Sequence, residues 1–255
     1  GCGVKVIELE HIEGIGPKTK ELLEKLGINS GEELILHYPF RYDILRRSDI
    51  SILNDKDKIV IDGVIEGQPT IIYLNKSLKK IIFRINANKS IMNVTLYNRV
   101  YLFNDLKPGK EVTILGRFHK LKNTIVASDI RFGLLPNDAK IEPVYSTTDG
   151  LSVKQISKYV TSALNEEYQI DGLVPKYLEE KYHLMSKKEA LKNVHIPESI
   201  DALKKARQRI KYEELFMYML KINYIKEKII TDTNAISRNI DKDKINKFIS
   251  NFPFK

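Results

Sequence analysis

Cysteine is almost absent from this sequence, because Cys2 is the only one among 255 residues. A single thiol excludes internal disulfides and any zinc or iron–sulfur site built on several cysteines. Such sparing use of cysteine is typical of a reducing compartment. No run approaches the roughly 18 apolar residues that a membrane span needs, and residues 1–5 do not form a signal peptide. We therefore expect a soluble cytoplasmic protein without a membrane partner.

The sequence also lacks an initiator methionine, and it stops at Phe252-Pro253-Phe254-Lys255 without a C-terminal cap. We therefore expect it to belong to a longer chain. With 42% hydrophobic and 29% charged residues, the composition is ordinary for a folded protein of one or two domains.

Recognisable catalytic motifs are missing as well. A nucleotide-hydrolysing loop would end in Gly-Lys-Ser or Gly-Lys-Thr, whereas Pro108-Gly109-Lys110-Glu111 is typical of a strand turn. The histidines are scattered without metal-ligand spacing, and we interpret all five as structural. They are His11, His37, His119, His183 and His195. These residues predict no catalytic site, no metal and no cofactor in this part of the protein.

The segment from Ile71 to Arg131 contains the entire positive excess of the chain. The full sequence has 42 basic and 33 acidic residues, a net charge of +9. This segment has twelve basic and three acidic residues, and the remaining 30 of each sign cancel. Concentrated basicity indicates a polyanion partner. The alternative is that lysines merely cover the solvent face of a sheet.

The first zone, up to about Ser48, is predicted to be helical. Pro17 suits the first position of a helix over 18–26, and Gly27 suits its end. A second short helix begins at Ser30 with a capping box.

The Gly14-Ile15-Gly16-Pro17 turn between these features resembles half of a helix-hairpin-helix. In such a turn, Gly14, Gly16 and Lys18 would contact a backbone phosphate. The same residues also simply make a tight turn, and the sequence leaves both interpretations open.

The second zone, from about Lys56 to Pro136, is rich in β-branched runs separated by turn residues. An apparently helical stretch over 99–106 falls between the third and fourth predicted strands. Five strands with a helix at that point is the order of an OB barrel. Such barrels bind single strands by contacting phosphates with cations and stacking bases on aromatics. The basic segment therefore coincides with the predicted barrel, which favours nucleic acid over mere surface decoration.

The third zone, from Leu151 onward, is again predicted to be helical. Ser152 with Gln155 and Ser186 with Glu189 are capping-box patterns, and no Pro or Gly interrupts a long helix over 199–231. The second half of that helix is apolar nearly all round, so we expect a further domain to cover part of it.

Several local strings in this order resemble the family of RecG branched-DNA helicases, over nearly the whole chain. Those that carry the resemblance are Gly14-Ile15-Gly16-Pro17-Lys18, Glu33 to Pro39 with Arg41-Tyr42, Glu142 to Leu151, Ala190-Leu191 with His195-Ile196-Pro197, Ala206 to Phe216, and Phe252 to Lys255. The resemblance implies a wedge that splits the arms of stalled replication forks or Holliday junctions in DNA repair and recombination by fork regression. It also implies that the parent is an ATP-dependent helicase whose motor domains bind ATP and Mg²⁺ outside this sequence.

In that family two barrel aromatics cap the separated template bases, and by position they fall on Tyr97 and Tyr101. Tyr97 stands where the family usually has Phe, which keeps the ring. The alternative is that both tyrosines belong to the barrel core. We expect the phosphates of the fork arms to contact the basic residues of the barrel. These are Lys76, Lys79, Lys80, Arg84, Arg99, Arg117, Lys120 and Lys122.

Together these patterns predict an α+β chain in four parts: a helical hairpin (1–55), an OB-fold wedge domain (56–136), a linker with short helices (137–198), and a long helix that begins the motor (199–255). We expect a monomeric, nucleoid-associated bacterial protein that packs on its own motor domains. A stand-alone OB protein that coats single strands, and a scaffold whose barrel binds protein, remain the alternatives.

Overall fold

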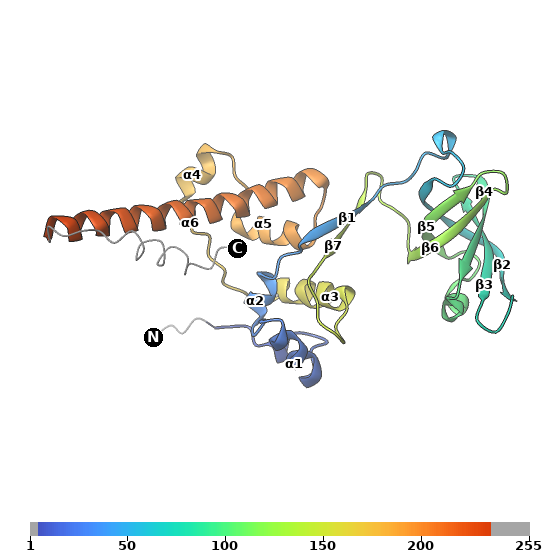
Figure 1. Ribbon diagram of the computed structural model, residues 1–255, viewed down its shortest axis with the longest axis horizontal. Helices are drawn as coiled ribbons and strands as arrows, with labels where there is room; N and C mark the ends of the chain where they lie inside the picture. Colours follow the sequence, from blue (N-terminus) through green and yellow to red (C-terminus); the bar gives the residue numbers. More distant parts are fainter. Residues whose placement is uncertain (1–4, 236–255) are drawn as a thin grey trace. The chain divides into compact units, whose positions relative to one another are not determined.

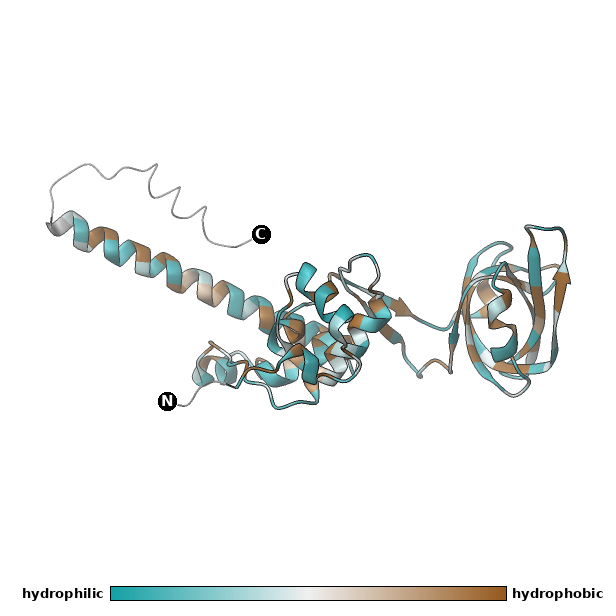
Figure 2. Cartoon of the chain, turned by 90° about the horizontal axis from the view of Figure 1, so that it is seen from below, coloured by the Kyte–Doolittle hydropathy of each residue, from teal (hydrophilic) through white to brown (hydrophobic). Residues whose placement is uncertain are grey.

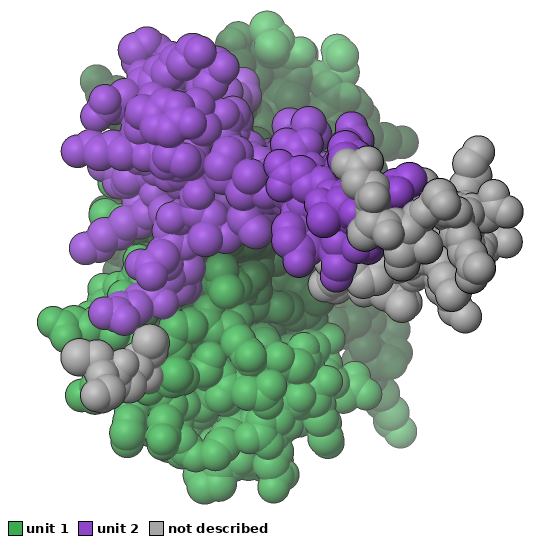
Figure 3. All heavy atoms as spheres, turned by 90° about the vertical axis from the view of Figure 1, so that its left-hand side faces the viewer, with its two compact units in different colours: residues 1–168, 192–203 green, residues 169–191, 204–255 purple. Residues whose placement is uncertain are grey.

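The computed structural model describes residues 5–235, so Cys2 and the string 252–255 lie outside the described residues. The chain divides into two compact units, residues 1–168 with 192–203 and residues 169–191 with 204–255 (Figure 3). Within residues 5–235, no helix combines the length and apolar character needed to cross a bilayer. The four predicted domain boundaries stay a prediction.

A closed five-stranded barrel forms the β-rich part of the first unit (Figure 1). Its strands are β2 (Lys58–Tyr73), β3 (Lys79–Ala87), β4 (Ser90–Tyr97), β5 (Glu111–His119) and β6 (Thr124–Phe132). They follow the order β2-β3-β4-β6-β5; β4 and β6 are parallel, and the other pairs are antiparallel. The short 3₁₀ helix η3 (Val100–Asp105) lies between β4 and β5, the third and fourth barrel strands. The predicted α+β fold with a five-stranded barrel is confirmed.

One long strand replaces three of the predicted runs. The β-branched runs over 59–61 and 64–65, and all but the last residue of the run over 71–74, lie within β2, which bends where its pairing with β3 shifts between Glu66 and Thr70. Gly67 at this bend has φ +72°, a conformation that favours glycine. A bulge with a glycine keeps one strand continuous while changing its direction.

Every second side chain along the strands points inward and fills the barrel interior. On β3, Ile81, Phe83 and Ile85 are buried, whereas Lys80 and Arg84 occupy the alternate outward positions. The period of two places one set of side chains in the core and the other on the outer surface. Lys80 and Arg84 therefore lie on the same strand as buried residues that hold the strand in the barrel.

The N-terminal helices match the prediction closely. Helix α1 (Pro17–Lys25) begins with Pro17, and Gly27 follows it at φ +80°. Helix α2 (Gly31–Ile35) begins after Ser30, whose hydroxyl accepts a hydrogen bond from the Glu33 N–H. The predicted capping box forms only in part, because the Glu33 carboxylate accepts from the Asn29 N–H instead of from Ser30. A 3₁₀ turn, η1 (Leu9–His11), precedes these helices.

A two-stranded ribbon was not predicted. Strand β1 (Arg41–Leu45) pairs antiparallel with β7 (Lys140–Val144), so the prediction that residues up to Ser48 are all helical is wrong here. Only Leu45 of β1 is buried, so this strand has no alternating pattern to read. Its partner also lies far along the sequence. A 3₁₀ turn, η2 (Ile50–Ile52), leads from the ribbon into the barrel.

Four helices follow the ribbon, namely α3 (Val153–Leu164), α4 (Lys176–Lys181), α5 (Lys187–His195) and α6 (Ile200–Ala235). The capping box of Ser152 and Gln155 is complete, as predicted. The predicted long helix is present as α6. Figure 2 shows hydrophobic and hydrophilic residues interspersed along α6.

The first turns of α6 are buried and its later turns are exposed. Leu203, Ala206 and Ile210 are buried, whereas Leu215 and Leu220 are 59% and 47% exposed. In the second unit, Glu213 accepts hydrogen bonds from Lys187 and from the Leu173 N–H. Arg209, which is fully buried, pairs with Glu179 at 3.0 Å. These contacts hold the start of α6 and leave its later apolar side chains exposed in the described structure.

Candidate nucleic-acid interface

Tyr97 and Tyr101, here called the tyrosine pair, lie on either side of the turn that leaves β4. Tyr97 is the last residue of β4 and is 39% exposed; Tyr101 belongs to η3 and is 74% exposed. Neither ring is part of the buried barrel core. Their exposure favours accessible rings over the alternative of core tyrosines with only their hydroxyls at the surface, and the stacking role stays a prediction.

The turn between these rings is held to the start of β3. Asn98 has φ +56°, and its backbone N–H donates to the Lys79 carbonyl at 2.8 Å. The Asn98 side-chain carbonyl accepts from the Lys79 N–H at 3.1 Å. Asparagine tolerates the left-handed conformation better than most residues because its short side chain can bond locally. Asn98 therefore fixes the point at which the chain leaves β4.

A third exposed ring, Tyr73, lies at the neighbouring strand end and was not predicted. Tyr73 is 65% exposed and pairs with Lys79, whose ammonium lies 5.4 Å from the centre of the ring. Lys80, the next residue, pairs with Tyr97 on the other side. Tyr73 lies two residues after Ile71, which packs against the barrel core, so both share one face of β2 and only Tyr73, at the strand end, is exposed. Because consecutive strand residues point to opposite faces, Tyr73 with Lys79 and Tyr97 with Lys80 are two pairs of a ring and an ammonium group on opposite faces.

Four predicted phosphate contacts gather on the β2–β3 hairpin, and we call Lys76, Lys79, Lys80 and Arg84 the hairpin group. Lys76 lies in the β2–β3 turn, where the Asn75 side chain accepts from the N–H groups of Ser77 and Leu78. Arg84 pairs with Glu66 across the strands, next to the β2 bend. An ideal Cβ on Gly67 would lie 3.0 Å from an Arg84 guanidinium nitrogen. The hairpin group therefore extends along the β2–β3 hairpin: Lys80 pairs with Tyr97, whereas Arg84 pairs with Asn93, four residues earlier on β4.

Three others lie at the β5–β6 hairpin, and we call Arg117, Lys120 and Lys122 the turn group. Arg117 donates to the Lys56 carbonyl at 3.0 Å and pairs with Lys58 of β2. A hollow of about 560 Å³ on the barrel wall is lined by Arg117, Lys58 and His119 among others. Lys58 escaped the sequence analysis because it lies before the basic segment, and strand pairing alone brings it here.

The turn group and the tyrosine pair lie toward opposite ends of β4. The β5–β6 turn contacts the beginning of β4, because Asn123 donates to the Ile91 carbonyl and Thr124 pairs with Asn93. Tyr97 lies four residues further along β4, about 13 Å at the strand rise. Arg84 pairs with Asn93, which pairs in turn with Thr124 beside the turn group, so the hairpin group extends from the level of Tyr97 to that of the turn group.

Arg99 differs from the other predicted cations because it is ion-paired within the barrel. Its Nη1 donates to the Asp129 carboxylate of β6 at 2.8 Å. Arg131 contacts the second oxygen of Asp129, and its Nε lies 3.2 Å from Glu142 of β7. Burial, the largest influence, tends to raise the pKa of Asp129, but hydrogen bonds from Arg131 and Arg99 lower it overall. Asp129 was not predicted as a site residue.

The Gly14, Gly16 and Lys18 turn has a structural explanation of its own. Gly14 has φ +89°, and an ideal Cβ there would lie 3.2 Å from the ring of Tyr159 on α3. Gly14 is therefore required for the packing of this turn against α3. Gly16 precedes α1, and Lys18 is exposed. A phosphate contact at this turn stays a prediction.

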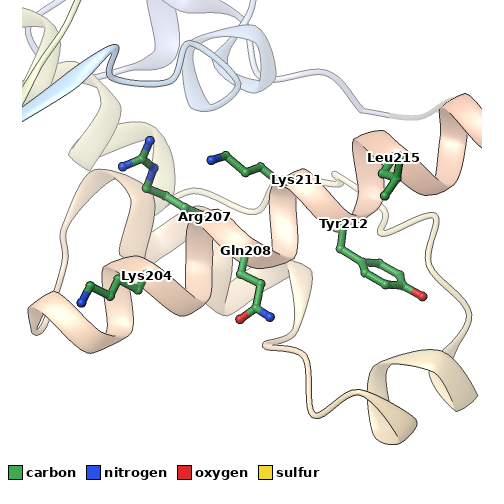
Figure 4. Close-up of a pocket in the computed structure, with 6 residues that line it drawn as sticks. All are labelled: Lys204, Arg207, Gln208, Lys211, Tyr212 and Leu215. Carbon is green, nitrogen blue, oxygen red and sulfur yellow. The ribbon is translucent and has the colours of Figure 1, made fainter.

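A further basic hollow, of about 460 Å³, lies along α6 in the second unit (Figure 4). Arg207 and Lys211 extend from one side of the helix, and Gln208 and Tyr212 extend from another. Lys204 and Leu215 complete its lining. Within residues 5–235, no cluster of three or more His, Cys, Asp or Glu side chains could hold a metal ion.

Comparison with known proteins agrees with this architecture. A family model described as the RecG wedge domain matches residues 8–166, which include the helical hairpin, the ribbon, the barrel and α3. A solved structure described as RecG bound to a three-way DNA junction has a TM-score of 0.73 to this chain at 24% identity. That likeness covers 100% of this chain and 36% of the other, and it shows the fold.

The curated relatives are described as ATP-dependent DNA helicase RecG, and each is much longer than this chain. The ATP-dependent DNA helicase RecG of Bacillus subtilis is 30% identical over 249 residues, which are 96% of this chain and 36% of the relative. RecG of Staphylococcus epidermidis is also 30% identical over 249 residues, with 97% and 36% covered. This chain therefore spans little more than a third of its relatives. Because the wedge-domain match extends over more than half of the sequence, the chain belongs to the RecG wedge-domain family.

Proposed function

We propose that this chain is the part of a RecG-type helicase that binds branched DNA and separates its strands. The substrates are stalled replication forks and Holliday junctions, and the role is fork regression in DNA repair and recombination. A relative of this fold is described as bound to a three-way DNA junction, which supports this substrate class. The +9 charge concentrated on the barrel segment supports a polyanion ligand.

The observation that carries the proposal is the exposed tyrosine pair at one end of the barrel. Two rings on either side of one turn, with Lys80 paired to Tyr97 on the adjacent strand, combine stacking surfaces with a phosphate contact. Stacking on an aromatic contributes about 1–3 kcal/mol per base. Tyr97 and Tyr101 would each cap one separated base and so oppose re-annealing at the branch.

The two basic groups take different parts of the junction in this proposal. The hairpin group holds phosphates from the tyrosine pair, where the strands part, back to the level of Asn93, where Arg84 lies. The turn group holds phosphates about 13 Å away along β4, roughly four nucleotides at the 3.4 Å spacing of one strand. Arg99 contributes a contact between the two rings, and the turn of Gly14, Gly16 and Lys18 contributes one outside the barrel.

The remaining length of the relatives supplies the motor in this proposal. The parent is an ATP-dependent helicase in the cytoplasm, and its motor domains bind ATP and Mg²⁺ outside this chain. The exposed apolar residues of α6 pack on those domains and link strand separation to translocation. Leu215, Met219, Leu220 and Tyr224 are between 47% and 64% exposed in the described structure, which supports a covering partner.

Fluorescence anisotropy with this chain tests the proposal. The ligands are a three-arm fork, a duplex and a single strand, each at two salt concentrations. We expect tightest binding to the fork, and a loss of at least about tenfold for the fork in Tyr97→Ala/Tyr101→Ala. Its salt dependence should persist, because the phosphate contacts remain.

Tyr177→Ala is the matched control, because it removes a ring that is 68% exposed on α4. This variant should keep the fork preference. Equal affinity of the native chain for fork and single strand would favour a stand-alone single-strand-binding protein. Absence of salt-dependent DNA binding would favour a protein-binding scaffold.

A further inference from the structure

Asp129 is an acidic residue on a surface that is proposed to bind DNA, where acidic residues are not expected. It is one of three acidic residues between Ile71 and Arg131, a segment with twelve basic ones. A carboxylate beside a nucleic-acid site repels phosphate. Its presence within hydrogen-bond distance of Arg99, in the middle of the tyrosine turn, therefore calls for a different role.

Both oxygens of the Asp129 carboxylate have partners. Oδ1 accepts from Arg99 Nη1 at 2.8 Å and from the Ile130 N–H at 2.9 Å. Oδ2 accepts from Arg131 Nη1. Arg131 in turn holds Glu142. The carboxylate is thus fixed from three directions, and it offers Arg99 a defined position.

A bulge in the barrel wall directs Asp129 toward Arg99. Leu115 and Gly116 are consecutive on β5, but their partners on β6 are Asp129 and Ala127, so Ser128 is the extra residue. Gly116 permits this close approach, because an ideal Cβ there would lie only 2.2 Å from the Val126 carbonyl oxygen. Bulges redirect side chains and often lie next to functional sites.

Arg99 lies in the backbone segment that joins the two rings, and its ion pair with Asp129 holds that segment. It is two residues from Tyr97 and two from Tyr101, and it precedes η3, at whose start no side-chain cap bond forms. On one side the turn is held by Asn98 and Lys79. On the η3 side, Leu102 and Phe103 pack against the barrel core, and the ion pair of Arg99 with Asp129 adds a side-chain contact at the turn itself. Loss of that pair would loosen the turn between the two rings while η3 stays packed on the barrel.

We propose that Asp129 is a positioning residue for the tyrosine pair: by holding Arg99 it sets the relative placement of Tyr97 and Tyr101 for stacking on separated bases. This role rests on the proposed function of the tyrosine pair. Asp129 does not itself contact DNA. Its charge is retained in a basic surface because it acts through Arg99.

Asp129→Asn in the 255-residue chain is the test, with a three-arm fork that carries 2-aminopurine at the branch. Stacking quenches this base, on a neighbouring nucleobase as well as on a tyrosine ring, so the part of the quenching that Tyr97→Ala/Tyr101→Ala removes reports the tyrosine pair. We expect the fork-to-single-strand affinity ratio to fall threefold or more, with weaker quenching. The salt dependence should be unchanged, because no phosphate contact is removed.

Asp105→Asn is the matched control, because it removes the same charge from an exposed residue of η3. A purely electrostatic effect would make both variants bind all three DNAs more tightly, with an unchanged ratio, and that result would overturn the proposal. The positioning role predicts a lower ratio for Asp129→Asn alone.

Arg99→Gln breaks the same ion pair from its other partner and also removes the phosphate contact proposed for Arg99, so overall affinity should fall as well. Its quenching should fall by a factor similar to that of Asp129→Asn. In the double variant with Asp129→Asn, the two losses of quenching should not add, because both act on the rings through one ion pair. Additive losses would contradict the proposal. A native chain without fork preference would refute the proposed function. If Asp129→Asn quenched 2-aminopurine normally while Tyr97→Ala/Tyr101→Ala did not, only the positioning role would be refuted.

Discussion

Acidification should destabilise the first unit through one buried histidine, His195 at the end of α5. The side chain is 3% exposed, and its Nε2 lies 2.5 Å from the Ile35 carbonyl. A carbonyl can only accept, so Nε2 carries the proton, and Nδ1 accepts from the Tyr145 hydroxyl at 2.8 Å. The folded protein therefore holds the neutral ring in one tautomer, joined to α2 and to the residue after β7.

The size of this loss of stability follows from the pKa of His195. Burial is the main cause that lowers it from 6.5 to about 4; the Ile35 hydrogen bond opposes this, and nearby His37 adds to it. The unfolded chain thus binds a proton as the pH falls through 6.5, while the folded chain stays neutral until about pH 4. Stability is retained above pH 6.5 and lost as the pH falls below it. Between pH 7 and pH 5 the loss is about 2 kcal/mol.

Urea unfolding followed by far-ultraviolet circular dichroism at pH 7 and pH 5 measures this loss. His195→Gln has no titrating ring, so it should lose about 2 kcal/mol less than the native chain over this range. Carboxylates common to both proteins cancel in the comparison. Equal losses in the two proteins would refute the assignment.

Tyr145→Phe is a useful companion variant, because it removes the hydroxyl bonded to Nδ1 but keeps the buried histidine. We expect about 1 kcal/mol lower stability at pH 7, with the pH-dependent loss retained. A variant that lost the pH dependence instead would show that the hydroxyl, and not burial, keeps His195 neutral.

Two further predictions concern the bulge and the long helix. Gly116→Ala would force a methyl group toward the Val126 carbonyl, so we expect the free energy of unfolding in urea to fall by about 1–3 kcal/mol. Gly16→Ala is the control, because no atom lies within 4 Å of a Cβ there. An equal or smaller loss in Gly116→Ala than in this control would contradict the prediction. The exposed apolar side chains of α6 should cause modest self-association at high concentration, reduced by Leu215→Lys/Leu220→Lys, and a clean native monomer by light scattering would count against it.

The barrel was predictable because its signals are local. Alternating β-branched runs, turn residues between them and a polar outer face all lie within neighbouring residues, as on β3. Helix α3 was equally clear, because Ser152 and Gln155 define its start within four residues. The β1–β7 ribbon had no such signal, since five mostly exposed residues must find partners about a hundred positions away.

The candidate site was predictable in its residue types but not in its arrangement. The tyrosine pair followed from a family resemblance, and its exposure agrees with that. The division of the cations into a hairpin group and a turn group depends on the register of β4 with β6. Asp129 was missed because its position depends on a bulge, which depends on how closely Gly116 approaches another strand.

Strand β4 links the two basic groups and so constrains how DNA can lie on the barrel. Between Tyr97 and the level of the turn group, Asn93 of β4 is half-buried and Thr95 is buried, so a DNA strand that reached both places would meet few exposed side chains of β4 itself. In the proposed function the turn group acts at a distance from the branch, so we expect its loss to lower affinity for every DNA and to leave the place where the strands part unchanged. We expect the opposite of the tyrosine pair, because stacking releases no counterions. The proposal therefore predicts that variants can change affinity and branch preference separately.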